Sequence, residues 1–418
     1  MTVALVMGNM IGSGIFLLPA SLASYAGLSL AGWLVSTLGA LALAAVFAHL
    51  AQLDPAAGGP YAYTRRTFGD LAAFLVGWGY WISIWTSLGA LAVAFAGYLG
   101  SVVPALTRSP AASAITAIAA VWVLIAVNAG GIRSAGWLQV VTTILKILPL
   151  LAIGALGLAH LEPAHFEVPD RDPRLVAASV SATATLTLWA FLGLESATVP
   201  AGGIENPGRT IPRATIVGTL LTAAIYIVST VGVMSLVPPS TLGQSQAPFA
   251  DAARTLWGSA GATIVALGAS LSAFGALNGW VLLVGQLPLA VARDGLFPRI
   301  FARVSSRGTP TIGMLIAGVL TTILVALNYT RGLVDLFTFF ILLSTLNTLV
   351  PYVFSSLAVF LFEPGGTRSR LSGGIASAAA LAFVYSVWAI GGAGQEIVYW
   401  GFLLIVCGLP VYVWCRRN

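Results

Sequence analysis

Charged residues are scarce in this sequence. They make up 8% of its 418 residues, against roughly 25% in an average soluble domain, and the mean hydropathy is +0.95. A soluble globular protein is therefore excluded. The apolar residues fall into runs of about 18 to 25 residues, the length that a helix needs to cross a hydrocarbon core about 30 Å thick. Runs such as 38–46 do not alternate in polarity, which excludes a transmembrane β-barrel and leaves an all-α integral membrane protein.

Cysteine, histidine and lysine are also rare. Cys407 and Cys415 lie in the last apolar run without His or Cys partners nearby, so we expect no disulfide framework and no metal site. The three histidines stand at span edges or in a loop, away from the partners that hydrolases need, so we predict no enzyme, no catalytic residue and no cofactor. A channel is disfavoured because no ring of carbonyls or charges marks a pore. The basic residues are scattered through loops, which argues against a nucleic-acid partner.

The apolar runs predict twelve transmembrane helices separated by short loops. Their expected ranges are 2–23, 28–52, 70–99, 111–128, 137–159, 175–200, 214–236, 259–291, 310–328, 335–362, 373–391 and 396–415. The run that begins at Met1 is continuous with further spans and lacks a charged leader, so we expect a membrane helix there and not a signal peptide.

The arginines indicate the orientation of these spans. With twelve spans, thirteen arginines fall on the side of both chain ends and five on the other side. Because positive loops stay in the cytoplasm, we predict a multi-pass protein of the cytoplasmic membrane with both termini cytoplasmic. The thirteen are Arg65, Arg66, Arg133, Arg209, Arg213, Arg293, Arg299, Arg303, Arg307, Arg368, Arg370, Arg416 and Arg417.

Two apolar runs are interrupted where a continuous helix would be expected. Gly12-Ser13-Gly14 breaks the first run and Gly193-Leu194-Glu195 breaks the sixth, and a proline follows each break. Matched broken helices in two halves point to a substrate site at the membrane midplane, because unwound backbone must line a polar cavity. The free amides at the start of a half-helix near Ile15 suit a carboxylate. The alternative is close helix packing through small residues.

Two ionisable residues lie well inside the predicted spans. Lys146 falls in the fifth helix and Glu195 at the sixth-helix break, and either would be costly in lipid, so each is expected to face the protein interior. Glu195 could carry a proton, attract a cation, couple to a gate or satisfy unwound amides. Lys146 could carry a proton or extend toward the membrane surface. Of the two residues, we expect Lys146 to provide proton linkage and Glu195 to act in gating or cation attraction.

Many short motifs resemble the amino acid-polyamine-organocation transporter family, in particular its arginine/agmatine-type antiporters. The matches run through nearly the whole chain. They include Gly8-Asn9, the segment 12–20 (GSGIFLLPA), 53–55 (LDP), 58–63 (GGPYAY), 189–197 (WAFLGLESA), 206–207 (NP), 248–249 (PF), 294–298 (DGLFP) and 350–352 (VPY). The resemblance implies a leucine-transporter-like five-plus-five inverted repeat, with residues 1–159 and 160–362 as the repeats and 363–418 as two added helices. It also implies a possible homodimer.

The family likeness assigns roles to individual residues. Ser13 with the backbone of Gly12 and Gly14 would hold a substrate carboxylate, and carbonyls near Ile11 and Trp189 would take the α-ammonium. Trp189 would face the substrate. The resemblance further implies that Trp280 is a middle gate and that Tyr80 is an aromatic of the cytoplasmic closure. Ser344 in the tenth helix is a weaker substrate contact by the same resemblance.

The sequence departs from the family's arginine site in the third and fifth helices. Leu88 stands where arginine/agmatine antiporters have an asparagine that binds guanidinium, with Ser83 and Ile84 on the same face. Lys146 is absent from those antiporters but resembles a lysine of proton-coupled and exchange-type transporters, where its ammonium stands in for sodium. We therefore predict a secondary transporter of amino acids that works by alternating access, proton-coupled or by exchange. The alternative is an arginine/agmatine-type or polyamine antiporter.

Overall fold

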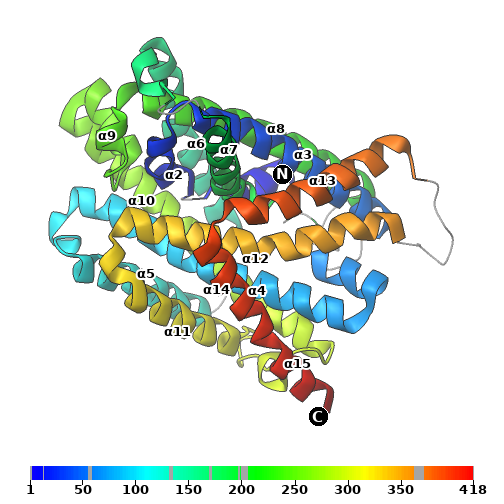
Figure 1. Cartoon of the computed structure of the whole chain (residues 1–418). Helices are drawn as coiled ribbons and strands as arrows, with labels where there is room; N and C mark the ends of the chain where they lie inside the picture. Colours follow the sequence, from blue (N-terminus) through cyan, green and yellow to red (C-terminus); the bar gives the residue numbers. More distant parts are fainter. Residues whose placement is uncertain are drawn as a thin grey trace.

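The structure is a computed structural model that describes residues 2–12, 14–54, 59–130, 135–168, 172–195, 198, 206–361 and 371–417. This described part is helical throughout and contains no strand (Figure 1). Its α-helices are α1 (Thr2–Met10), α2 (Gly14–Leu22), α3 (Leu28–Leu53), α4 (Pro60–Val102), α5 (Pro110–Ala129), α6 (Ala135–Ala159), α7 (Pro173–Leu188), α8 (Pro207–Leu236), α9 (Pro239–Leu242), α10 (Pro248–Arg293), α11 (Thr311–Asn328), α12 (Leu333–Leu361), α13 (Gly373–Gly392), α14 (Gln395–Val406) and α15 (Gly408–Arg417).

Short 3-10 helices lie between several of these elements. They are η1 (Ala23–Tyr25), η2 (Pro104–Leu106), η3 (Pro163–Phe166), η4 (Trp189–Phe191), η7 (Arg299–Ala302) and η8 (Tyr329–Arg331). Of these, η4 matters most for function, because it follows α7 directly and begins an unwound segment.

The described residues contain ten helices that are long and apolar enough to cross a membrane. The all-α membrane class is therefore confirmed. Two further predicted spans correspond to shorter apolar helices, Gly14–Tyr25 and Ile147–Ala159. The total of twelve spans and their division into repeats remain predictions.

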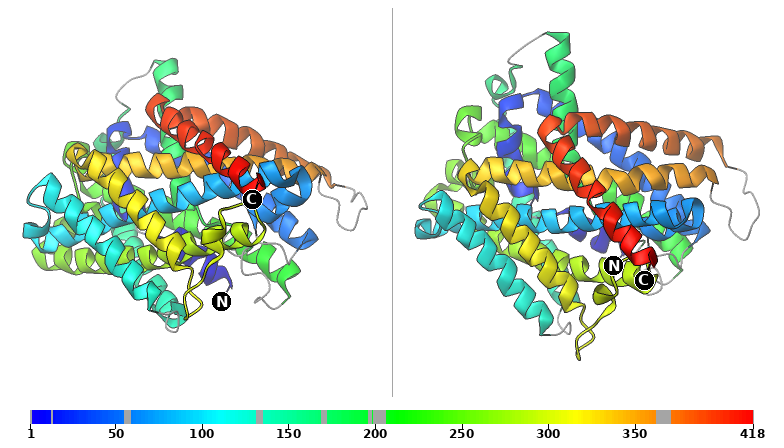
Figure 2. Two further views of the ribbon diagram at one scale, coloured as in Figure 1. Left: turned by 90° about the horizontal axis from the view of Figure 1, so that it is seen from below. Right: turned by 60° about the horizontal axis from the view of Figure 1, so that its bottom comes forward.

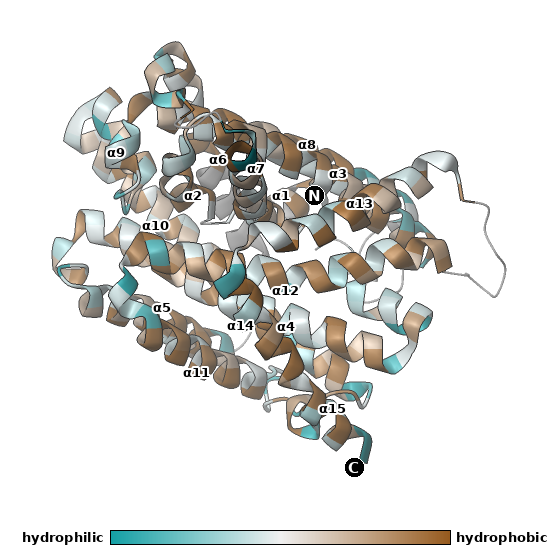
Figure 3. Ribbon diagram, in the orientation of Figure 1, coloured by the Kyte–Doolittle hydropathy of each residue, from teal (hydrophilic) through white to brown (hydrophobic). Residues whose placement is uncertain are grey.

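The helix α4 lies at the centre of the bundle. Buried residues make up 89% of its apolar window, against 17% for the window within Gln395–Arg417. It packs against α12 and α10, while α14 and α15 cross its outer side (Figures 1 and 2). On one flank α5 and α11 run side by side, and Figure 3 colours most of their residues as hydrophobic. Their exposed apolar side chains, such as Ile115 and Leu327, suit contact with lipid.

Two long helices bend at a glycine near their start. α4 has 43 residues and α10 has 46, and both turn at a residue with positive φ, Gly69 (81°) and Gly258 (67°). Only glycine adopts this backbone conformation readily. Each bend separates a short first segment from the part that is expected to span the membrane. Both bends lie one residue before the predicted span starts, at 70 and 259.

The first predicted span is broken where the sequence indicated. α1 ends at Met10 and α2 begins at Gly14. The sixth break starts earlier than predicted, because α7 ends at Leu188 and the chain passes through η4 into extended backbone at Leu192. Gly193 follows with φ of 100°. The predicted break at Gly193 is therefore confirmed, while the departure from regular α-helix begins at Trp189, four residues earlier.

Candidate functional site

The segment between α1 and α2 departs from regular helical hydrogen bonding inside the protein. The carbonyl of Met10 accepts a hydrogen bond from the Tyr226 hydroxyl at 2.6 Å and another from the Gly12 amide at 2.7 Å. Ile11 is fully buried here. The first amides of α2 have no partner within their own helix, so they can donate to an anion. Ser13 lies outside the described residues.

The second break faces the first across a small cavity. The cavity and its opening enclose about 300 Å³ of empty space. Residues of both breaks line it, together with residues of α4 and α10. The lining is Met10, Gly12, Gly14, Ser87, Leu91, Trp189, Ala190, Leu192 and Trp280.

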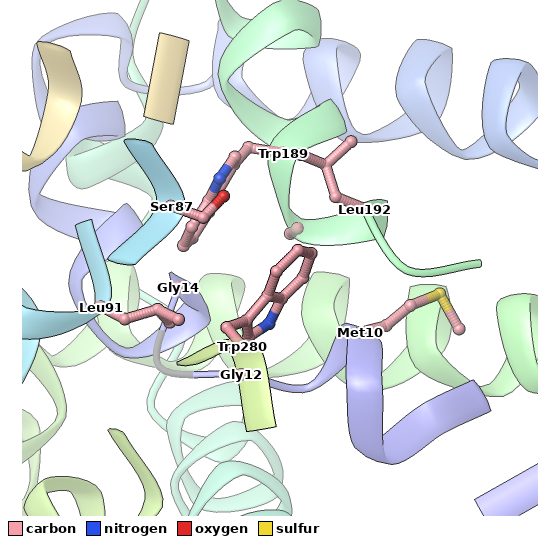
Figure 4. A pocket seen from close by; sticks show the side chains of 9 residues that line it. Met10, Gly12, Gly14, Ser87, Leu91, Trp189, Leu192 and Trp280 are labelled. Atoms are coloured by element: carbon pink, nitrogen blue, oxygen red, sulfur yellow. The ribbon is translucent and has the colours of Figure 1, made fainter. Parts of the chain in front are cut away.

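Two indole rings dominate this cavity. Figure 4 shows Trp189 and Trp280 projecting toward the same space from η4 and α10. Trp189 is 7% exposed, and its ring meets that of Phe337 edge-on at a centroid distance of 5.5 Å. None of the lining side chains is charged. A ligand here would be held by backbone groups, aromatic faces and the Ser87 hydroxyl.

Gly14 makes room for Trp189. A Cβ atom built on Gly14 would overlap three carbons of that indole ring. The absence of a side chain therefore lets Trp189 lie against the start of α2. This contact joins the two breaks directly.

Glu195 follows the cavity residue Leu192 by three positions and is completely buried. Its carboxylate accepts hydrogen bonds from the Tyr80 hydroxyl of α4 at 2.6 Å and from the Tyr352 hydroxyl of α12 at 2.8 Å. Among the described residues, Glu195 forms no ion pair, because every ion pair there involves another carboxylate. We call Tyr80, Glu195 and Tyr352 the tyrosine clamp. The clamp ties the unwound sixth-span segment to two central helices.

The predicted third-helix contacts lie beside the cavity and not on its wall. Ser83, Ile84 and Leu88 are all fully buried outside the lining, and the cavity instead meets Ser87 and Leu91 of the same helix. Ser344 of α12 sits behind Ser87, with the two hydroxyl oxygens 2.7 Å apart. For Lys146 the structure describes the helix, α6, but not the side chain.

The structure thus brings together Gly12, Gly14, Trp189 and Trp280 from the predicted set, and places Tyr80 with Glu195. Sequence reasoning missed the lining residues Met10, Ser87, Leu91, Ala190 and Leu192, and the clamp residue Tyr352. Tyr352 falls in a motif that the family likeness already included. Ser87 lies seven residues after Tyr80 and so on the same helix face, and this spacing could have indicated Ser87 as a site residue.

Comparison with known proteins decides the family. The amino acid permease family matches residues 1–391. The chain belongs to this family. The likeness to the amino acid-polyamine-organocation transporters is thereby confirmed, and this amino acid permease is a multi-pass membrane protein of a transporter family.

Three relatives with named activities align with most of the permease sequence. A cadaverine/lysine antiporter of Escherichia coli K12 is 35% identical over 88% of this chain and 84% of its own length. A putative arginine/ornithine antiporter of Bacillus subtilis 168 is 34% identical over 98% of this chain and 94% of its own. The putrescine transporter PotE of E. coli K12 is 31% identical, with 98% and 93% covered. These relatives are transporters and not enzymes.

Proposed function

We propose that this permease exchanges a cationic amino acid for a related amine across the cytoplasmic membrane by alternating access. The observation that carries the proposal is the meeting of two broken helices at a cavity closed by Trp189 and Trp280. Free amides at the start of α2 suit a carboxylate, and indole faces suit an ammonium group. The relatives named for lysine, ornithine, cadaverine and putrescine support a substrate of this class.

Within this proposal the substrate carboxylate lies against Gly12, Ser13 and Gly14. Carbonyls near Ile11 and Trp189 take the α-ammonium. Trp280 acts as the middle gate because its ring faces the cavity from the α10 side. The hydroxyl of Ser87 meets the distal part of the substrate.

Pairs of matching elements support the five-plus-five arrangement. The first and sixth spans are both broken, and the third and eighth are both long helices that begin with proline and bend at a glycine with positive φ. Such correspondence is what an inverted repeat produces. Twelve spans with both termini in the cytoplasm complete the proposed topology.

The tyrosine clamp supports a gate on the cytoplasmic side. In the proposed topology α4 starts in the cytoplasm, and Tyr80 lies nearer that end than the cavity residues Ser87 and Leu91. Breaking the bonds from Tyr80 and Tyr352 would release the unwound segment that carries Glu195. Protonation of Glu195 would weaken these bonds, because a neutral carboxyl accepts hydrogen bonds less strongly than a carboxylate. Glu195 is thus proposed as both gate and proton site, with Lys146 as the alternative proton site.

Exchange by purified protein in liposomes tests the proposal. A five-compound panel, consisting of radiolabelled L-lysine, L-arginine, L-ornithine, cadaverine and putrescine, is offered to liposomes loaded with each unlabelled compound in turn. At least one pair is expected to exchange several-fold faster than uptake into empty liposomes, while L-leucine serves as the neutral control. Exchange of leucine alone would refute the cationic substrate class.

A further inference from the structure

A row of buried hydroxyl groups runs along the contact between α4 and α12. Tyr80, Ser83 and Ser87 lie on one face of α4, and Ser344, Thr348 and Tyr352 lie on the facing side of α12. All six are at most 5% exposed. Their spacings, three and four residues on α4 and four and four residues on α12, keep each set on one helix face. We call these six residues the hydroxyl row.

The middle of the row is linked by hydroxyl-to-hydroxyl contacts. The Ser87 and Ser344 oxygens are 2.7 Å apart and those of Ser344 and Ser83 are 3.1 Å apart. Ser83 is also bonded to Thr348. In each of these pairs either oxygen can donate. The Ser344 hydroxyl also lies 3.0 Å from the Ser83 carbonyl, and the Thr348 hydroxyl lies 3.0 Å from the Ser344 carbonyl, so each of these protons has both a hydroxyl and a carbonyl as acceptors.

The two ends of the row reach different sites. Ser87 lines the cavity, whereas the Tyr80 and Tyr352 hydroxyls donate to Glu195. Tyr80 lies three residues before Ser83 on α4, and Tyr352 lies four residues after Thr348 on α12, so each tyrosine begins about one helical turn from the hydrogen-bonded middle of the row.

The row is more than the usual behaviour of hydroxyls in membrane helices. A buried threonine normally bonds to the carbonyl four residues earlier, as Thr345 does with Ile341 at 2.7 Å. Thr348 makes the same bond to the Ser344 carbonyl at 3.0 Å, but its hydroxyl is also bonded to the hydroxyl of Ser83. Burying six hydroxyl groups in one helix contact costs free energy unless each of them is hydrogen-bonded. In the structure this polar seam leads from the cavity to an otherwise buried carboxylate.

We propose that the hydroxyl row carries protons between the substrate cavity and Glu195. The inference rests on the proposed role of Glu195 as the proton site. A proton donated by water in the cavity is accepted by Ser87, and each hydroxyl then passes its own proton to the next as far as Ser83 and Thr348. A bridging water molecule relays the proton from there to a clamp tyrosine, which gives its own hydroxyl proton to Glu195. The net result is one proton lost by the donor in the cavity and one gained by the Glu195 carboxylate, with no other change in the row.

The surroundings of Glu195 are consistent with this route. The titratable groups that face it are Tyr80 from α4 and Tyr352 from α12, and Tyr385 from α13 lies near Tyr352. Among the described residues, no arginine or histidine pairs with Glu195. A proton therefore has the hydroxyl row as its polar path from the cavity.

Transport driven by an imposed pH gradient tests the proposal. Uptake of each panel compound into liposomes is compared with and without the gradient for wild type, Thr348→Val and Ser83→Ala. Thr345→Val is the matched control, since it removes a buried threonine hydroxyl from the same helix outside the row. Thr348→Ser restores the hydroxyl. Monodisperse elution of the purified variants shows that they fold.

The expected result is at least a five-fold loss of gradient stimulation in Thr348→Val and Ser83→Ala, with recovery in Thr348→Ser and no loss in Thr345→Val. Unchanged stimulation in both row variants, while Glu195→Gln abolishes it, would overturn the hydroxyl row and leave the role of Glu195 standing. No stimulation in wild type, or full stimulation in Glu195→Gln, would overturn both. An equal loss of gradient stimulation in Thr345→Val would also overturn the proposal, because it would show that these substitutions act by disturbing helix packing.

Discussion

The indole ring of Trp189 lies against Gly14, at the point where a Cβ atom on that glycine would overlap it. Gly14 begins α2 and Trp189 begins η4, so this single contact joins the two broken spans of the permease. The site can form only if position 14 has no side chain.

Replacing Gly14 by valine is therefore expected to abolish exchange of the panel compounds, because Trp189 must leave its place or the break must shift. The protein should still insert into the membrane, since the change is apolar. Gly268→Ala is the control, because a Cβ there meets nothing within 4 Å. Normal exchange kinetics in Gly14→Val would contradict the proposed carboxylate site.

Removal of either cavity indole should weaken binding far more than removal of a peripheral one. We expect Trp189→Ala and Trp280→Ala to reduce the affinity for panel compounds by at least ten-fold, because each ring forms a wall of the cavity. Trp400 is 47% exposed, and Trp400→Ala is expected to change affinity less than two-fold. Equal, small effects at all three positions in a binding assay would count against this cavity.

The tyrosine clamp should contribute to the stability of the closed state. Tyr352→Phe deletes a hydrogen bond to a buried carboxylate, and such a bond is worth about 1.5 to 3 kcal/mol. Thermal unfolding of the purified protein should show a lower midpoint for this variant. Tyr385→Phe is the control, because its buried hydroxyl has no hydrogen-bond partner in the described part of the chain. Equal unfolding midpoints for the two variants would contradict the stabilising role of the tyrosine clamp.

Two substitutions separate the candidate proton sites. If Glu195 is the site, Glu195→Gln should flatten the pH profile of exchange and Lys146→Met should leave it intact. If Lys146 is the site, the outcomes are reversed. Exchange in liposomes over a range of pH checks this, and an unchanged profile in both variants would refute proton linkage through either residue.

Hydropathy and local motifs predicted much of this fold and part of the site. The spans are long and apolar, so their positions follow from composition, and even the bends at Gly69 and Gly258 coincide with predicted span starts. Gly12, Gly14, Trp189 and Trp280 were predicted because broken helices and family motifs mark them. They do line one cavity.

The remaining site residues depend on how helices rotate against one another. Ser83 and Leu88 were expected at the cavity, yet the packing of α4 against α12 turns Ser87 and Leu91 toward it. Tyr352 acts through a hydrogen bond to a residue 157 positions away. Periodicity within one helix cannot specify its partner face, so these contacts required the tertiary structure.

The most direct test of the account is an experimental structure of the permease with the panel compound that exchanges fastest. The compound is expected to lie in the cavity between the two breaks, with its carboxylate, or for a diamine one ammonium, at the first broken span and its chain between Trp189 and Trp280. A compound bound elsewhere, with this cavity filled by side chains in every state, would contradict it.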